Sequence, residues 1–467
     1  MNKKQLLSYA LGPVGTGLLA LGTVPLVAWF FSPADVGRLY VLQTVIAFAV
    51  IVVFLGLDQA YVREFHETTD AGSLLRATFL PAAALLTVVV LAALPFSSTI
   101  SVWLFESSEP TFVWVTLGCA LCAFVSRQLS LILRMEERAF TFSLSQLLPK
   151  LIFVVLVAAV SVLSVEPSFL GLALSLLIAS ASVMLALVWS TRATWNAAVR
   201  ARGRHFDLSK LLRFGLPLML ASLAYWGLTA TSAFMLRGLS DLTQVGIYSV
   251  SMSVAGIAAI FQTIFTVIWA PLVYKWVATG TDISNIERVS RQALVVVVAV
   301  LSCGGMMSWS LEFVLPSEYS TVQYLFLCTV IQPLLYTLSE ITGIGIAVTR
   351  RTAFSLWTTL LALATNIALN VLLIPALGAA GAVIANALSF AVFFIGRTEA
   401  SARVWRPVPR LRIYLVVLSG VAMSVLTVLV GSQLGYWIVV VWALYGVFFL
   451  TVMRADVRAL LALVRRR

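Results

Sequence analysis

The sequence predicts an all-α, polytopic membrane protein with about 14 transmembrane helices. Of its 467 residues, 61% are hydrophobic and only 11% are charged, and that charge is about half of what a soluble domain carries. The apolar residues form runs of about twenty, the length that an α-helix needs to cross a bilayer. The basic residues gather in alternate connecting segments, as the positive-inside rule requires of cytoplasmic loops. These observations exclude a soluble globular fold.

The polar segment 191–213 divides the apolar runs into two groups, with about six before it and about eight after it. It is strongly basic, and by the positive-inside rule it lies in the cytoplasm. Its basic residues are Arg192, Arg200, Arg202, Arg204, Lys210 and Arg213. We therefore expect an N-lobe over 1–190, a cytoplasmic connector over 191–210, a C-lobe over 211–396, and a C-terminal region over 397–467.

The first lobe is expected to hold six spans, and charged segments alternate with them in a consistent topology. The charges from Arg134 to Arg138 end the fourth span, and the acidic segment from Phe96 to Pro110 is expected to be an outside loop. The other five expected spans are Leu6–Phe31, Val36–Leu57, Ser73–Pro95, Phe142–Ser164 and Phe169–Ser190.

The second lobe and the C-terminal region continue the alternation and place both chain termini in the cytoplasm. The last two spans form a pair beyond the second lobe. The expected spans are Leu211–Leu236, Val245–Ala270, Val289–Leu311, Val322–Val348, Ala353–Ile374, Ala379–Gly396, Ile413–Val430 and Trp437–Met453.

A weak internal repeat relates the two lobes. The segment LLSYALGP at Leu6 returns as LLRFGLP at Leu211, and SPADVGRLY at Ser32 returns as SDLTQVGIY at Ser240. Six helices per repeat is an even number, so both lobes enter the membrane from the same side. Parallel repeats of this kind occur in transporters that bind substrate between their halves.

The net charge of +12 does not indicate a nucleic-acid partner, because the basic residues follow the predicted topology rather than one surface. The chain has only 2 histidines, so we expect no histidine-based metal or catalytic centre. The apolar part of the N-terminus is too long for a signal peptide, and we interpret it as a first, uncleaved helix.

Three segments resemble a known family. They are LGLDQAYVREFHE at Leu55–Glu67, SDLTQVGIYSVS from Ser240, and ATNIALNVLLIPALGAAGAVIANALS at Ala364–Ser389. They are similar to segments of bacterial polysaccharide exporters and O-antigen flippases, which form one branch of the multidrug/oligosaccharidyl-lipid/polysaccharide (MOP) flippase superfamily. Many O-antigen members have about twelve helices, so the extra C-terminal pair indicates a longer exporter subgroup.

The resemblance implies a flippase rather than an enzyme. Its substrate would be a polyprenyl-pyrophosphate-linked oligosaccharide (an O-antigen, capsule or exopolysaccharide unit), moved by alternating access from the inner to the outer leaflet of the bacterial cytoplasmic membrane. Membrane lipids, a polysaccharide polymerase and glycosyltransferases are the partners this implies. No cofactor is expected, and coupling to a H⁺ or Na⁺ gradient is left open.

Charged residues inside predicted spans are candidates for substrate binding, because charge in hydrocarbon is costly. Lys150 follows Ser143 and Gln146 on one face of the fifth span, and Arg127 lies near the end of the fourth. Both would supply positive charge for a pyrophosphate. For Arg127, the alternative is a side chain that extends to the interface.

Two further arginines, Arg38 and Arg237, lie near the outer surface and are candidates for the outer mouth of a cationic cavity. The alternative is an ion pair with Asp35 or Asp241. On the cytoplasmic side, Asp58, Arg63 and Glu64 are candidates for a gate, or for surface ion pairs. Asn366 and Asn370, one helical turn apart, are expected to make hydrogen bonds between membrane helices.

Glu340 is the candidate for ion coupling. Gln332, Tyr336 and Glu340 lie along one face of the tenth span, and Glu340 is about 15 Å from the cytoplasmic turn at Arg350. A buried carboxyl group there could load and release a proton or bind Na⁺ as the lobes alternate. The alternative is a neutral acid, or one paired with a Lys or Arg, that only stabilises the bundle.

Other functions remain open from the sequence. A multidrug exporter or a lipid II-like exporter of the same superfamily is the nearest alternative, although Lys150 and Arg127 argue against a cationic drug. A membrane glycosyltransferase or polymerase would need catalytic acids and a large outside loop, and the sequence predicts no such loop. A structural scaffold would not need charges inside the membrane.

Overall fold

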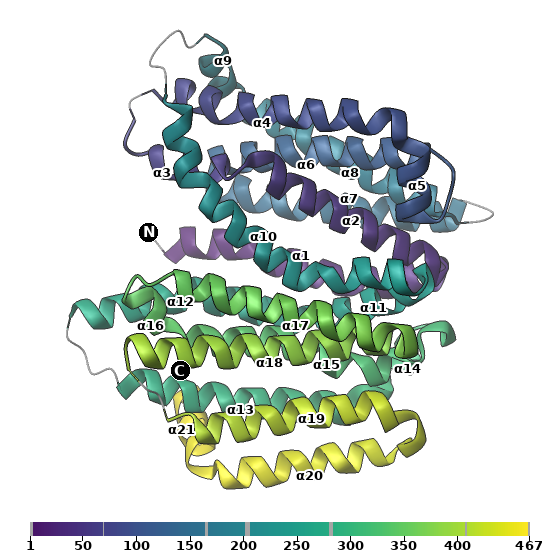
Figure 1. The fold of residues 1–467 in the computed structure, drawn as a ribbon, viewed down its shortest axis with the longest axis vertical. Helices are drawn as coiled ribbons and strands as arrows, with labels where there is room; N and C mark the ends of the chain where they lie inside the picture. Colours follow the sequence, from purple (N-terminus) through teal and green to yellow (C-terminus); the bar gives the residue numbers. More distant parts are fainter. Residues whose placement is uncertain are drawn as a thin grey trace. The chain divides into compact units, whose positions relative to one another are not determined.

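A computed structural model of the chain describes residues 3–68, 70–163, 167–200, 206–279, 284–406 and 409–465. Within these ranges the protein is built from α-helices and short 3₁₀ turns, and contains no β-strand (Figure 1). The predicted fold class, an all-α polytopic membrane protein, is confirmed. Of the predicted connector, residues 201–205 lie outside the described part of the chain, and so do Arg466 and Arg467 at the C-terminus.

The chain forms two compact units, Met1–Gly227 and Leu228–Arg467. The boundary falls within one long helix, α10 (Leu208–Leu239). The finer division into four segments that we expect from the sequence stays a prediction.

The first unit contains the N-terminal helices and the first part of α10. In it α1 runs beside α7, and α6 packs between α2 and α8. The helices are α1 (Lys3–Phe30), α2 (Pro33–Phe54), α3 (Leu57–Glu64), α4 (Ala71–Ala93), α5 (Ser97–Phe105), α6 (Thr111–Met135), α7 (Ala139–Leu163), α8 (Phe169–Ser190) and α9 (Arg192–Arg200).

The second unit is organised around α15 and α18, which pack against each other and are the most enclosed of its spans. Its helices are α11 (Leu242–Val254), α12 (Gly256–Ala278), α13 (Ser284–Met307), α14 (Leu311–Val314), α15 (Val322–Thr342), α16 (Ile344–Val348), α17 (Ala353–Leu377), α18 (Ala379–Val404), α19 (Leu411–Leu434), α20 (Trp437–Val452) and α21 (Arg454–Arg465).

Among the described residues, 12 helices are long and apolar enough to cross a membrane, or up to 13 if α20 and α21 are counted as one bent span. Helix α1 adds a shorter apolar segment, Gly15–Phe30. This segment is shorter than those spans, so the expected count of about 14 stays a prediction. The chain is therefore a multi-pass membrane protein.

Several segments expected to be loops are helical instead. The predicted outside loop from Phe96 to Pro110 contains α5, whose sequence SSTISVWLF is mostly apolar. The expected connector likewise contains the helix α9.

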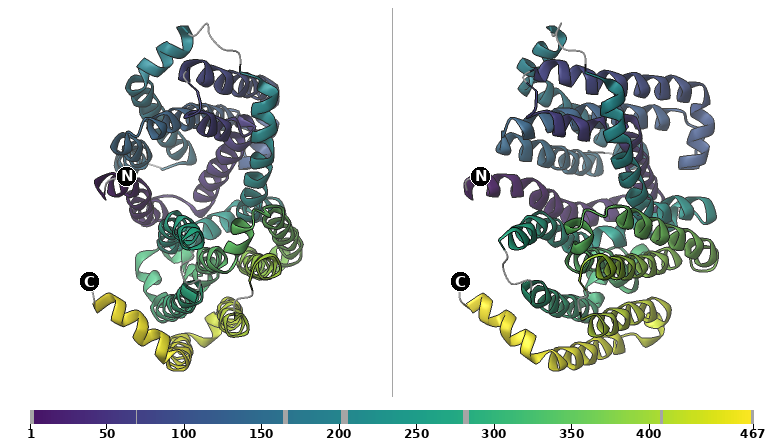
Figure 2. Two further views of the ribbon diagram at one scale, coloured as in Figure 1. Left: turned by 90° about the vertical axis from the view of Figure 1, so that its left-hand side faces the viewer. Right: turned by 60° about the vertical axis from the view of Figure 1, so that its left-hand side comes forward.

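Other expected spans differ in shape from the prediction. The span expected from Val245 to Ala270 is divided at Ala255 into two helices, α11 and α12. At the C-terminus the chain bends by 82° between α20 and α21, a turn that is visible in yellow in Figure 2.

Side-chain caps determine where three of the helices begin. The side chains of Ser32, Asp70 and Asp241 each accept a hydrogen bond from the backbone N–H three residues later, at the start of α2, α4 and α11. Such caps satisfy donors that the first helical turn leaves unpaired. The polar residues between the apolar runs therefore have a direct structural role.

A buried amide cluster joins α17 to the second-unit part of α10. The Asn370 Nδ2 donates to Asn366 Oδ1 at 2.8 Å and to the Ser232 hydroxyl at 3.0 Å. All three side chains are buried. The predicted role of the two asparagines, hydrogen bonding between membrane helices, is confirmed.

Candidate functional site

The first unit encloses a cavity of about 500 Å³. Six helices contribute to its lining: α2, α3, α6, α7, α8 and α10. One part of the wall is apolar and comes mainly from α2, and the other part carries hydroxyl, amide and charged groups. The polar lining residues are Asp58, Gln59, Ser126, Arg127, Ser130, Ser145, Gln146 and Ser222.

A sharp turn between α2 and α3 places Asp58 in this wall. Leu55 and Gly56 both adopt left-handed backbone conformations, with φ of 51° and 76°, so that α2 ends and α3 begins in a new direction. Asp58 lies in the first turn of α3, where a negative charge is stabilised by the helix dipole. Its side chain is only 11% exposed.

Two glycines allow α10 to approach this turn closely. A Cβ atom added at Gly215 would lie 2.7 Å from the carbonyl carbon and oxygen of Gly56, and one added at Gly56 would collide with the Gly215 carbonyl. Only residues without a side chain can pack at this distance. The contact holds the base of α3, and with it Asp58, against α10.

Arg127 of α6 forms an ion pair with Asp58. Its Nη2 lies 3.0 Å from Asp58 Oδ2, and Gln59 Nε2 donates to the same oxygen at 3.0 Å. Arg127 is 48% exposed, so it lies at the open side of the pair. From the sequence, Arg127 was assigned to a cationic cavity and Asp58 to a gate. The structure brings them together in the wall of one cavity.

Lys150 lies on α7, one helical turn beyond the cavity-lining Gln146. The Lys150 side chain is half-buried and makes no ion pair with any residue that the structure describes. Ser143, which shares the same face of the helix, is buried. The predicted polar stripe therefore leads to the cavity through Gln146, while Lys150 itself is not among the residues that line it.

Arg63 and Glu64, the other two gate candidates, lie at the end of α3. The Arg63 guanidinium stacks over the Phe214 ring of α10 at 4.5 Å, and its Nε lies 3.9 Å from Glu64 Oε1. Neither residue lines the cavity. Tyr61 lies earlier on the same helix. Burial and, to a lesser extent, the negative charge of Glu136 raise the pKa of Tyr61, so its hydroxyl stays protonated and neutral. A gating role for these residues stays a prediction.

Arg38, one of the two arginines expected near the outer surface, forms an ion pair with Asp35. Its Nη1 lies 2.7 Å from Asp35 Oδ1, and its Nε donates to the Phe105 carbonyl at 2.8 Å. This is the ion pair that the sequence left open as the alternative. Arg237 is half-buried near the end of α10, in the second unit. A role for either residue at a cavity mouth stays a prediction.

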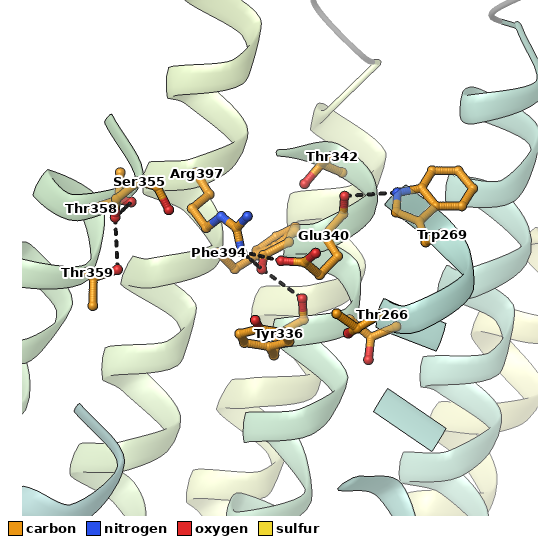
Figure 3. A network of polar contacts seen from close by, with 12 residues as sticks. Thr266, Trp269, Tyr336, Glu340, Thr342, Ser355, Thr358, Thr359, Phe394 and Arg397 are labelled. Carbon is orange, nitrogen blue, oxygen red and sulfur yellow. Dashed lines mark hydrogen bonds and ion pairs between the residues drawn. The ribbon is translucent and has the colours of Figure 1, made fainter. Parts of the chain in front are cut away.

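The candidate coupling residue, Glu340, is engaged by Arg397. Arg397 Nη1 lies 2.7 Å from Glu340 Oε1 (Figure 3). The same nitrogen lies 3.2 Å from the Ser339 hydroxyl. The two charged side chains are 13% and 14% exposed, and the Trp269 indole donates to the Glu340 carbonyl at 3.0 Å. The structure therefore has the paired arrangement that the sequence left open as the alternative to coupling.

Sequence reasoning missed Arg397 as a partner because we expected the twelfth span to end at Gly396 and Arg397 to begin a basic loop. Helix α18 instead continues to Val404, so Arg397 lies within the helix, and it also sits over the Phe393 ring at 5.3 Å. The sequence did carry one signal for this pair: α15 and α18 are both apolar helices, and they carry charges of opposite sign, Glu340 and Arg397. Gln59, Ser126 and Ser222 of the cavity wall carried no comparable signal.

These features define a multi-pass membrane protein whose bundle of apolar helices holds a cavity with a partly polar wall. Residues 3–275 match the family model described as polysaccharide biosynthesis protein. The match covers more than half of the chain, and the chain belongs to this family. The family of polysaccharide biosynthesis proteins expected from the sequence is confirmed. No curated protein matches the chain.

Several solved structures share the fold of this chain. The lipid II flippase MurJ, in an inward closed conformation, matches with a TM-score of 0.71 and 10% identity, covering 96% of this chain and 98% of that one. An inward-facing multidrug resistance MATE family transporter matches with a TM-score of 0.56 and 16% identity, covering 86% and 96%. A MOP superfamily transporter from Pyrococcus furiosus matches with a TM-score of 0.51 and 18% identity, covering 86% and 96%.

At these identities the likeness is one of fold. The proteins that share it are transporters and flippases rather than enzymes.

Proposed function

We propose that this protein is a flippase that moves a polyprenyl-pyrophosphate-linked oligosaccharide across the membrane by alternating access. The observation that carries the proposal is the cavity of about 500 Å³ in the first unit, with polar groups on one wall and Lys150 one helical turn away. Membership of a polysaccharide biosynthesis family and a fold shared with a lipid II flippase support the same substrate class.

The physical requirements of such a substrate agree with this cavity. A pyrophosphate bearing sugars is highly polar, and hydrocarbon rejects it unless polar groups replace its water. A cation inside the membrane lowers the cost of bringing in the anion. Lys150 is suited to this role, because no acidic group among the described residues neutralises it.

We further propose transport from the inner to the outer leaflet of a bacterial cytoplasmic membrane, with both chain termini in the cytoplasm. The distribution of basic residues supports this orientation. In this setting a glycosyltransferase would supply the substrate and a polymerase would consume the product. A H⁺ or Na⁺ gradient is the proposed energy source.

The test is flipping of a fluorescent polyprenyl-pyrophosphate oligosaccharide in proteoliposomes, followed with a quencher that cannot cross the membrane. Lys150→Ala should slow flipping roughly 10-fold or more, because a charge-assisted contact contributes about 1.5–3 kcal/mol. Lys150→Arg should retain much of the rate. The matched control is Lys210→Ala, since Lys210 is an exposed lysine outside the cavity.

Two results would contradict the proposal. If the unmodified protein does not flip the lipid-linked oligosaccharide but exports lipophilic drugs, it is a multidrug exporter. If it flips a lipid II-like substrate and rejects longer oligosaccharides, the substrate class is narrower than proposed. A normal rate in Lys150→Ala would remove Lys150 from the pyrophosphate site.

A further inference from the structure

We infer that the Asp58–Arg127 pair binds the sugar part of the substrate, and that it determines preference for a glycan-bearing lipid over the bare lipid pyrophosphate. This inference rests on the proposed function and assigns separate parts of the headgroup to separate residues. The sugar hydroxyls lie against Asp58, Gln59 and Arg127, and the pyrophosphate is left to Lys150.

The first reason is charge. With Arg127 Nη2 at 3.0 Å from Asp58 Oδ2, the two side chains form a pair with no net charge. A pyrophosphate bound to Arg127 would lie close to the Asp58 carboxylate, and like charges at such a distance repel each other strongly where little water screens them. The pair is therefore a poor anchor for an anion.

The second reason is unused hydrogen-bonding capacity. Among the described residues, both bonds to Asp58 reach Oδ2, from Arg127 and from Gln59, and none reaches Oδ1. Arg127 has five N–H donors and uses one of them on Asp58, with its side chain 48% exposed. Acceptors and donors thus lie side by side at the cavity. A sugar hydroxyl both donates and accepts, so a pair of neighbouring hydroxyls matches this arrangement.

The third reason is the rest of the wall. The other polar groups that line the cavity are neutral hydroxyls and amides, from Ser126, Ser130, Ser145, Gln146 and Ser222. Such groups recognise uncharged polar ligands by hydrogen bonding. The volume of about 500 Å³ lies within the range of roughly 300–1,000 Å³ that is usual for small-molecule sites.

The fourth reason is that the pair is held in place. Asp58 lies in the first turn of α3, whose base is packed against α10 by the Gly56–Gly215 contact, and its side chain is 11% exposed. A group that is fixed before the ligand arrives loses little entropy on binding, and this favours discrimination between ligands. Arg127 provides the exposed, more adaptable half of the pair.

The experiment compares the affinities of the purified full-length protein for two lipids in nanodiscs. Both carry the same polyprenyl pyrophosphate, and only one carries the oligosaccharide. The unmodified protein should bind the glycan-bearing lipid more tightly. Asp58→Asn should weaken binding of that lipid roughly 10-fold to 100-fold, because a polar group of the site loses its partner. It should not weaken binding of the bare lipid, because the change removes a charge that repels the pyrophosphate. Arg127→Lys should also weaken binding of the glycan-bearing lipid more than binding of the bare lipid.

Lys150→Ala provides the matched comparison, because it should weaken binding of both lipids by the same factor and leave their ratio unchanged. If Asp58→Asn preserves the ratio, or weakens both lipids equally, the pair is a structural link between α3 and α6 and the inference is wrong. Equal affinity of the unmodified protein for both lipids would also overturn it, with the flippase intact. Binding of neither lipid would instead overturn the proposed function, and the inference with it.

Discussion

Two acid–arginine pairs, one in each unit, have the same chemistry in different surroundings. In the first unit Arg127 and Asp58 meet at 3.0 Å in a cavity wall, and the arginine is 48% exposed. In the second unit Arg397 and Glu340 meet at 2.7 Å, and both side chains are nearly enclosed, at 13% and 14% exposed. The first pair is accessible to a ligand. The second is surrounded by protein.

This difference indicates different roles. A charge in an enclosed pair has no replacement partner, so loss of either residue leaves the other charge buried and unpaired. A pair at a cavity can exchange its contacts with water or with a ligand, so loss of one residue affects binding more than folding. Exposure therefore separates a structural pair from a binding pair more reliably than the distance between the charges does.

The largest effect is expected for Arg397→Ala. Removing this arginine leaves the Glu340 carboxylate buried without its partner, and we expect a loss of about 3–5 kcal/mol in the free energy of unfolding. Unfolding in detergent, followed by circular dichroism, measures it. The double variant Glu340→Leu with Arg397→Met should recover most of the loss. A double variant as unstable as Arg397→Ala alone would show that the pair's charges are not the cause.

A smaller effect is expected for Glu340→Gln. The amide oxygen still accepts a hydrogen bond from Arg397, but the guanidinium loses its counter-charge, so the cost is about 1–3 kcal/mol. Because the structure pairs Glu340 with Arg397, we expect flipping in proteoliposomes to keep its response to an imposed H⁺ or Na⁺ gradient. Loss of that response, with substrate binding intact, would instead establish Glu340 as the coupling residue.

Asp58→Asn should change stability still less, by about 1 kcal/mol or below, because its partner is half exposed to the cavity. The same unfolding measurement checks this value, and Arg134→Ala, on the exposed side of α6, serves as the control for the helix. A loss as large as that of Arg397→Ala would mean that both pairs are structural, and the comparison between them would fail.

The smallest effect concerns Asp70, which makes no ion pair with an arginine in the part of the chain that the structure describes. Hydrogen bonds from the Ser73 hydroxyl and backbone N–H lower the pKa of Asp70. The ionised Asp70 therefore stabilises the folded protein at any pH above about 3.9, the pKa of aspartate in the unfolded chain. This stabilisation is lost as the pH falls through the lower pKa that Asp70 has in the folded protein. A pH series of unfolding midpoints should show this small loss in the unmodified protein and not in Asp70→Asn. Identical series would contradict it.

The sequence predicts the fold well, because membrane spans depend on local composition. Runs of apolar residues and the charges between them are visible without any tertiary contact, as in the span that ends at Arg134. Segments that fold by packing are harder to predict, and α5 lies where an acidic loop was expected.

The candidate site depends on contacts between distant residues, and these are beyond sequence patterns. Asp58 and Arg127 are 69 residues apart, and nothing local to either one indicates the other. The same applies to Glu340 and Arg397, which are 57 residues apart. The cost of burying charge identified Arg127 and Glu340 as candidates, and Asp58 was a candidate because of its place at the cytoplasmic gate. Neither argument indicated which residues would pair.

The close approach of Gly56 and Gly215 has a consequence for how substitutions combine. A methyl group added to either residue would have to force the same two segments apart, so the steric costs of the two changes overlap. The left-handed backbone at Gly56 adds a separate strain to a substitution there. Once the first alanine has forced the helices apart, the second finds room already made. A double-mutant cycle should therefore be strongly non-additive, with the pair costing much less than the sum of the single changes. For protein engineering, the two glycines are best varied together.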